Sequence, residues 1–205
     1  MKPPAAGETV IASKTGNNYY LYLAKLKNGN YKLVPFMKIQ FFFEDDHGLK
    51  WTTAGRSKFV NDWKAAVKSK WGNRTVKSLS GGKKVILDFR FTSQIGGWMW
   101  DHWEITVNKI PKGYFETSSV TDGWINNVNL DSEDLTLVSK ARGHKQRGAV
   151  HEFGHMSGLD DEYLKSSPHK KSVKSIMHSG ESVMHRHDSE LMKWLNKQLK
   201  EHGIK

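Results

Sequence analysis

The sequence has 205 residues, a length that suits one globular domain, and its 8 Trp, 9 Phe and 6 Tyr supply bulky core side chains that a disordered chain lacks. It contains no Cys, which excludes disulfide bonds and zinc sites built from thiolates. The net charge of +11 favours anionic partners, but the lysines are spread along the chain and no signature of a nucleic-acid-binding module is present.

The first part of the chain predicts a β-hairpin followed by a long helix. Residues 19–27 and 33–43 are rich in apolar side chains, and Asn28-Gly29 between them is a typical hairpin turn. Residues 53–71 place apolar side chains at helical spacing, and Gly72 follows as the end of that helix.

The middle of the chain predicts shorter strands. Residues 84–91 are expected to form one strand, and the alternation of apolar and polar residues at 103–110 predicts a strand with one exposed face. Within the polar segment 111–131, an edge strand is expected near 114–115, and another short strand at 135–138. Four aromatic side chains are expected mainly in the core, with a substrate groove as the alternative: Trp98, Trp100, His102 and Trp103.

The last part of the chain predicts two helices joined by a polar connection. Residues 144–157 are expected to be helical and to stop at Gly158, and 164–182 form the connection. A final helix is expected at 188–201, with Asp188 or Ser189 as its cap and an apolar face toward the core.

One segment carries residue types that indicate chemistry. His151 and His155 are four residues apart and therefore share a helix face, where both imidazoles can bind one metal ion. Imidazole nitrogens suit zinc, and Glu152 lies beside them without having to be a ligand. A carboxylate in that place can take a proton from water at the metal and pass it to a leaving amine. The pattern is short, and an ordinary amphipathic helix with two histidines is the alternative.

A third ligand is expected shortly after the helix. Gly158 lies three residues after His155, where the helix must end if the chain is to return to the metal. Asp161 follows three residues later, and this spacing favours it over the neighbouring carboxylates. Asp160 and Glu162 are interpreted as solvated groups or as partners that orient a histidine.

The segment HEFGHMSGLDD (151–161) resembles the zinc signature of the metzincin peptidases, HExxHxxGxx followed by His or Asp. The form with Asp is similar to that of snapalysin-type peptidases, and the continuation to Tyr163 resembles bacterial metallopeptidases delivered by contractile secretion systems. The resemblance implies one Zn²⁺ per chain, held by the two histidines and Asp161, and Glu152 as the general base and acid.

The resemblance also implies an α+β, metzincin-like fold: a twisted mixed β-sheet with an active-site helix, a methionine turn and a C-terminal helix. We expect a single domain over 1–205, with 1–32 as an N-terminal β-hairpin extension and 33–205 as the catalytic core. The order of the predicted elements agrees with this arrangement.

The methionine turn below the metal is expected at 175–180. Met177 is favoured as the turn methionine because Gly180 permits a sharp turn, and Met184 is its rival. Either methionine alternatively fills a gap in the core.

Some metzincins carry a Tyr two residues after the turn methionine, where this chain has Ser179. The oxyanion donor must then be the zinc alone or another side chain. The candidates are Tyr163, His178, His185 and His187. A fourth ligand from His169 or His187 would instead close the site and make it structural.

These observations predict a zinc metallopeptidase that hydrolyses protein or peptide substrates, as a bacterial toxin or effector with a cognate inhibitor or immunity protein. Two alternatives stay open: a hydrolase of peptidoglycan stem peptides with the same zinc site, and a basic, non-enzymatic module that binds polyanions. No specific nucleic-acid partner is expected, and the default oligomeric state is a monomer.

Targeting signals are sparse. No stretch approaches the roughly 20 apolar residues of a membrane span, and the first five residues lack the apolar region of a secretory signal peptide. We therefore expect a protein that is secreted or delivered by a pathway without an N-terminal signal peptide, or otherwise a cytoplasmic one.

Overall fold

The computed structural model describes residues 4–98, 101–121 and 126–205. They form an α+β fold in which three α-helices accompany a nine-stranded mixed β-sheet. The long strand β3 (Tyr31–Glu44), predicted at 33–43, lies at the centre of the sheet. The α+β class and the mixed sheet are confirmed, whereas the metzincin-like topology stays a prediction.

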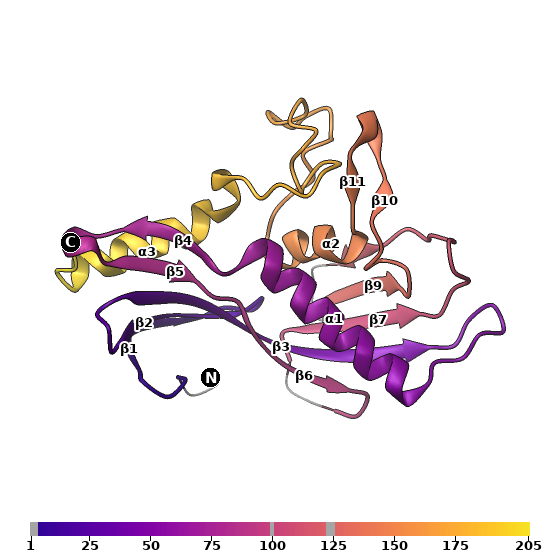
Figure 1. The fold of residues 1–205 in the computed structure, drawn as a ribbon, viewed down its shortest axis with the longest axis horizontal. Coiled ribbons are helices and arrows are strands. Elements are labelled where there is room, and N and C mark those ends of the chain that lie inside the picture. The colour runs from indigo at the N-terminus through magenta and orange to yellow at the C-terminus, as the bar shows by residue number, and fades with distance from the viewer. Residues whose placement is uncertain (1–3, 99–100, 122–125) are drawn as a thin grey trace.

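Both edges of β3 pair with two strands each. One edge pairs with β2 (Tyr20–Leu26), antiparallel, and further along with β7 (Trp103–Asn108), parallel. The other edge pairs in parallel with β5 (Lys84–Leu87) and β6 (Arg90–Ile95). Figure 1 shows β3 running through the middle of the fold.

The remaining strands extend the sheet outward. β1 (Glu8–Thr15) pairs with β2, and β4 (Arg74–Ser78) pairs with β5, both antiparallel. Beyond β7 lie β9 (Asn127–Asp131), parallel to it, and then β8 (Ser119–Thr121), antiparallel to β9. Within the described residues no strand pairs with the outer edge of β8, so its backbone groups there are open to a further strand.

The helix α1 (Thr53–Trp71) has the bounds that its apolar spacing predicts. The hydroxyl of Thr52 accepts a hydrogen bond from the backbone N–H of Gly55 (3.0 Å) and caps the first turn. The chain leaves the helix at Gly72, as predicted.

A cluster of aromatic rings holds the helix α2 (Gly148–Met156) against α1 and the sheet. Phe153 of α2 is fully buried, and its ring centroid lies 5.9 Å from those of Trp63 and Trp71 in α1 and 5.1 Å from that of Phe89. Trp71 also donates its indole N–H to a backbone carbonyl of α2 (2.9 Å). Burial of such large rings stabilises the position of the short α2 far more than its own nine residues could.

The C-terminal helix α3 (Ser189–Glu201) confirms the helix predicted at 188–201. Its buried face consists of Leu191, Leu195 and Leu199. Asp188 occupies the cap position but makes no capping hydrogen bond, because its carboxylate pairs with both terminal nitrogens of Arg74 (2.5 Å each). The helix is therefore tied to β4 through this ion pair.

The other regular elements are short. Three 3₁₀ turns lie at Ser80–Gly82, Ala141–Gly143 and His185–Asp188. A small hairpin of β10 (Val138–Ser139) and β11 (Lys145–Gln146) precedes α2 and stands out from the body of the fold (Figure 1).

Two predicted elements are longer than the observed ones. The strand predicted at 84–91 is divided into β5 and β6 at residues 88–89, although the N–H of Asp88 still donates to the Leu33 carbonyl of β3 (2.9 Å). The Asp88 carboxylate accepts hydrogen bonds from Lys32 and Arg90 there (3.0 and 2.8 Å). The helix predicted at 144–157 begins only at Gly148, because the preceding residues pair as β11.

The edge strand predicted near 114–115 is wrong. Tyr114 and Phe115 lie outside the strands and are exposed, and the outer place in the sheet is taken by β8. The strand predicted at 135–138 is also wrong except for its last residue, which begins β10. β1 and β9 were not predicted, because long-range pairing rather than a local apolar pattern selects these polar segments.

The aromatic residues 98–103 divide between core and surface. His102 and Trp103 are buried, as predicted, whereas Trp98 is 77% exposed and does not belong to the core. Trp100 lies outside the described residues.

The predicted hairpin is confirmed, with β2 and β3 joined at Gly29, whose φ of 83° is the left-handed conformation that glycine favours. The boundary expected at residue 32 falls inside β3, and Leu21 and Leu23 of the hairpin belong to the main core. Within the described ranges, no helix combines the length and apolar composition that crossing a membrane requires.

A buried ion pair ties β1 to β6 and gives a pH-dependent prediction. Hydrogen bonds from Arg90 (2.8 Å) lower the pKa of Glu8 from 4.5 to about 2, and the Glu8 side chain is only 4% exposed. Because the pKa is depressed in the folded state, the stabilisation is complete above pH 4.5 and is lost as the pH falls toward 2.

Glu8→Gln should therefore lower the free energy of unfolding by about 2–3 kcal/mol at pH 7. Urea titrations at several pH values should show this deficit shrinking between pH 4.5 and pH 2. A deficit that is the same at both ends of that range would contradict the electrostatic origin.

Candidate metal centre

The helix α2 and the turn after it bring the three predicted ligands together. His151 and His155 lie on one face of α2, which ends at Met156. Gly158 follows with a φ of 87°, a left-handed conformation that glycine adopts without strain, and reverses the chain. Asp161 thereby returns to the helix face that carries the two histidines.

The ligand atoms converge on one point. Oδ1 of Asp161 lies 3.3 Å from Nε2 of His151 and 3.3 Å from Nε2 of His155. In each ring the other nitrogen, Nδ1, lies 2.7 Å from a backbone carbonyl, that of Ile176 for His151 and that of Leu159 for His155. Donation from Nδ1 fixes the neutral tautomer in which Nε2 carries a lone pair.

The chemistry of this cluster fits a zinc ion. Oδ1 of Asp161 is buried and, among the described residues, has no hydrogen-bond donor, so it and the two Nε2 atoms present three lone pairs to one another. Such an arrangement is repulsive unless a cation or an extra proton lies between the atoms. Two imidazole nitrogens and a carboxylate oxygen form a common zinc donor set.

The electrostatics of the site point the same way. Burial acts to lower the pKa of His151, but the Asp161 carboxylate and the Ile176 carbonyl outweigh it, and the pKa is raised overall. The same pairing leaves the pKa of Asp161 lowered despite its burial. A site that attracts a proton in this way attracts a metal cation for the same reason, and metal binding then competes with protons.

Glu152 lies next to the ligands on α2 and is 7% exposed. Burial raises its pKa, although the neighbouring His151 and His155 act to lower it. A carboxyl group whose pKa is raised holds a proton more readily than an ordinary carboxylate, which suits a group that must both accept and release one. No ion pair of Glu152 with a lysine or arginine is found among the described residues, so it is not committed to a structural role there.

Met177 is fully buried against α2, and its role as the turn methionine stays a prediction. Its sulfur packs on Gly154 of α2, and it also lines the cleft beside His155. Met184, the rival, is half-buried and lies at the start of the 3₁₀ turn before α3. The turn at 175–180 is so tight that a Cβ at Gly180 would overlap the backbone of Lys174.

The contact between Gly154 and Met177 gives a second prediction. At an open helix position Gly→Ala stabilises by about 1 kcal/mol, but the Cβ of Gly154→Ala would overlap the Met177 sulfur. We expect a loss of about 1–3 kcal/mol in the free energy of unfolding. In urea titrations, the double variant with Met177→Ala should lose less than the sum of the single variants, and strict additivity would contradict this contact.

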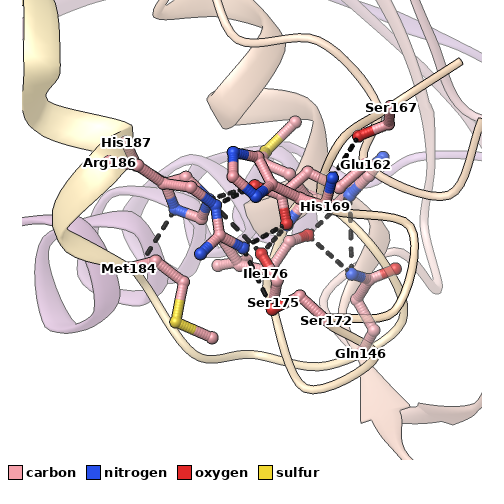
Figure 2. A network of polar contacts seen from close by, with 12 residues as sticks. Gln146, Glu162, Ser167, His169, Ser172, Ser175, Ile176, Met184, Arg186 and His187 are labelled. Carbon is pink, nitrogen blue, oxygen red and sulfur yellow. Dashed lines mark hydrogen bonds and ion pairs between the residues drawn. The ribbon is translucent and has the colours of Figure 1, made fainter.

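Glu162, one of the alternative ligands, is engaged elsewhere. Its carboxylate accepts two hydrogen bonds from Arg186 (2.6 Å each) and lies 3.0 Å from Nε2 of His187. These partners overcome the effect of burial and lower the pKa of Glu162 to about 2. In the network that Figure 2 draws, Ser175 also lies 3.3 Å from His187, so the connection after α2 is cross-linked without regular secondary structure.

Gln146 is a supporting residue that the sequence did not reveal. Its amide donates to the carbonyls of Ile176 (2.8 Å) and Gly180 (2.9 Å), and the Ile176 carbonyl in turn bonds to His151. Gln146 thus fixes the group that orients a candidate ligand. Its place five residues before His151 has no recognisable sequence signal.

The other predicted residues have different positions. Asp160 is exposed and lines the cleft. His178 was predicted as a possible contact, but both its ring nitrogens are engaged, with Ser179 (2.8 Å) and the Lys170 carbonyl (3.2 Å), and it does not line the cleft beside the ligands. That prediction is not supported.

A fourth protein ligand is absent from the cluster that the described residues form. His187 has both nitrogens bonded, to Glu162 and to the backbone N–H of Met184 (3.1 Å), and His169 and His185 are exposed. A zinc ion held by these three residues would therefore keep a coordination position for water or substrate, as catalytic zinc sites do.

Two adjoining clefts meet at the three ligands. The larger, about 620 Å³, runs along the connection after α2 and is lined by Ser166, Pro168 and His169 among others. The smaller, about 360 Å³, is bounded by Glu152, Tyr163 and the segment 118–120 at the start of β8. Tyr163 is half exposed, and its hydrogen bond to Asp161 raises the pKa of its hydroxyl to about 12.

The start of α2 contacts the segment before β8 that borders the smaller cleft. Gly148 has no side chain and leaves room for the carboxylate of Asp134, which accepts a hydrogen bond from Ser118 (2.8 Å) just before β8. Burial raises the pKa of Asp134 to about 7. The N-terminus of a helix favours a carboxylate at this place.

No protein-family model, no curated protein and no solved structure matches the chain. The function must therefore be inferred from the side chains at this site.

Proposed function

We propose that the protein is a zinc-dependent metallopeptidase of the metzincin type, with one Zn²⁺ held by His151, His155 and Asp161. The observation that carries this proposal is the convergence of three lone pairs, with Nε2 of His151 and of His155 each 3.3 Å from Asp161 Oδ1, beside the buried Glu152. A structural zinc site would need a fourth protein ligand, for which the described residues offer no candidate in the cluster.

Zinc in such a site supplies a Lewis acid that polarises a peptide carbonyl and makes water acidic near neutral pH. Glu152 takes the proton of the attacking water as a C–O bond forms at the carbonyl carbon. The same carboxyl then gives that proton to the departing nitrogen as the C–N bond breaks. Its raised pKa and its burial suit both steps.

Tyr163 is the best-placed donor to the oxyanion among the predicted candidates. It lines the cleft beside the ligands, and a hydroxyl with a pKa of about 12 stays protonated at neutral pH and can donate a hydrogen bond. Its present partner, Asp161, would be occupied by the cation.

The substrate is expected to lie along β8. The segment 118–120 borders the smaller cleft, and no strand of the described residues pairs with the outer edge of β8. An extended peptide can pair with such an edge and place one carbonyl near the ligands.

Hydrolysis of an unstructured protein tests this function. The zinc-loaded protein should cleave β-casein, 1,10-phenanthroline should abolish the cleavage, and added Zn²⁺ should restore it. Absence of cleavage of β-casein and of any peptide in a diverse library would contradict the proposal.

A further inference from the structure

One wall of the larger cleft belongs to a lysine-rich segment, although the lysines are not among the side chains that line the cleft itself. The residues that line it at 166–169 are flanked by Lys165 on one side and by Lys170 and Lys171 on the other, with Lys174 following. All four lysines are exposed. No Asp or Glu occurs anywhere between Tyr163 and Gly180.

A second basic segment stands beside the first. The hairpin of β10 and β11 carries Lys140, Arg142 and Lys145, all exposed. Lys140 is near enough to Glu152 to act on the pKa of that group. The base of the hairpin is bonded to the connection after α2, through Gln146 as above and through the ion pair of Arg147 with Glu181 (2.6 Å). Figure 1 shows the hairpin and the connection rising on the same side of α2.

The charges of these two walls are not neutralised. In the part of the chain that the structure describes, no carboxylate lies within 4.0 Å of any of the seven side chains, which are Lys140, Arg142, Lys145, Lys165, Lys170, Lys171 and Lys174. By contrast, the arginines at the base, Arg147 and Arg186, each have a glutamate partner. Unpaired like charges around one cleft repel each other and raise the local concentration of an anionic ligand.

The floor between the walls is not basic. A bound Zn²⁺ would offset the charges of Asp161 and Glu152, and the exposed Asp160, which lines both clefts, adds a negative charge. A nucleic-acid strand carries a phosphate at every step and would bring one of them against Asp160. A peptide can place a neutral residue over the floor and acidic residues against the walls.

From these observations we propose that the cleft selects peptide segments whose acidic residues flank a neutral cleavage site, an inference that rests on the proposed peptidase function. The two basic walls attract the flanking carboxylates, and Asp160 disfavours one beside the scissile bond. Acidic segments of proteins and the acidic stem peptides of peptidoglycan share this chemistry.

Cleavage-site mapping in a peptide library, by mass spectrometry, should show Asp and Glu enriched on both sides of a neutral site. A synthetic peptide with such a site should be cleaved with a kcat/KM about tenfold or more above that of its Glu→Gln counterpart at low salt. The ratio should fall in 0.5 M salt, where the Debye length is only about 4 Å. The inactive Glu152→Gln variant should bind the Glu peptide more tightly than the Gln peptide in fluorescence anisotropy.

Charge reversals identify the walls. Lys170→Glu/Lys171→Glu and Arg142→Glu/Lys145→Glu should each lower kcat/KM for the Glu peptide about tenfold, mainly through KM, and leave the Gln peptide nearly unchanged. Lys25→Glu/Lys200→Glu is the matched control: both lysines are exposed, and β2 and the end of α3 lie away from the hairpin (Figure 1). It changes the net charge equally and should have no such effect.

The outcomes separate the two proposals. Equal cleavage of both peptides would overturn the acidic preference and leave the peptidase intact, whereas cleavage of no peptide would overturn the peptidase and the preference with it. Tighter binding of the oligonucleotide dT20 than of the Glu peptide would make the walls a nucleic-acid surface and overturn the preference. Release of peptides from purified sacculi, in preference to cleavage of the protein-derived peptide, would support the acidic preference. It would also identify peptidoglycan as the source of the substrate.

Discussion

Replacing Glu152 by Gln should abolish peptide hydrolysis while the metal stays bound. Glutamine keeps the shape and the burial of Glu152, which is 7% exposed, but it cannot accept the proton of water at neutral pH. Loss of general acid–base catalysis lowers rates by about 10²–10⁴-fold, so we expect kcat to fall by that factor. Glu152 contributes no atom to the cluster of ligand atoms, so zinc affinity should change little.

The measurement combines kcat on a cleaved peptide with metal content on the same preparation of Glu152→Gln. Glu190→Gln serves as the control, because Glu190 is an exposed residue of α3 that pairs with the exposed Lys193. Hydrolysis that survives Glu152→Gln at the wild-type rate would rule out the acid–base role. Loss of metal from that variant would instead make Glu152 part of the metal site.

The second large effect is expected at Asp161. Asp161→Ala removes one of three converging ligands and leaves two imidazoles, so zinc should bind more than about 100-fold more weakly. Asp160→Ala is a closely matched control, since the neighbouring carboxylate is exposed and outside the cluster. Competition with a fluorescent zinc chelator measures both affinities.

Asp160→Ala should retain zinc affinity within about twofold of the wild type. Equal loss in the two variants would mean that the net charge of the segment, rather than the geometry at Asp161, holds the metal. Loss in Asp160→Ala alone would exchange the roles of the two residues. Either result would contradict the ligand set.

Much of the candidate site follows from local sequence patterns. The helical spacing of His151 and His155 and the turn at Gly158 depend on interactions within a few residues, and they place the ligands where the structure has them. The long helix α1 is similarly local, because Thr52 caps it and Gly72 ends it. Such short-range rules of spacing and capping can be read directly from a sequence.

The supporting parts could not be predicted, because they depend on distant partners. Gln146 acts through carbonyls 30 and 34 residues further along the chain. Glu162 was interpreted as a solvated group or as the partner of a histidine, and its pairing with Arg186, 24 residues away, has no signal in the sequence. The polar strand β9 is held by β7 on one edge and by β8 on the other. None of these pairings leaves a periodic pattern in the sequence.

The sequence also could not show that the basic side chains gather around the cleft. Lysines and arginines occur along the whole chain, and many of them lie on solvated faces. Only the fold places the hairpin of β10 and β11 beside the connection after α2. Part of the positive charge, which had no assigned role in the sequence, therefore lies near the candidate ligands.

The most direct test is the zinc content of the purified protein, measured by elemental mass spectrometry after zinc loading and extensive dialysis, beside His155→Ala. Circular dichroism should confirm that both preparations are folded. We predict about one zinc per wild-type chain and none retained by the variant. A wild-type protein that holds no zinc, or a variant that keeps it, would contradict the metal centre on which the proposed function depends.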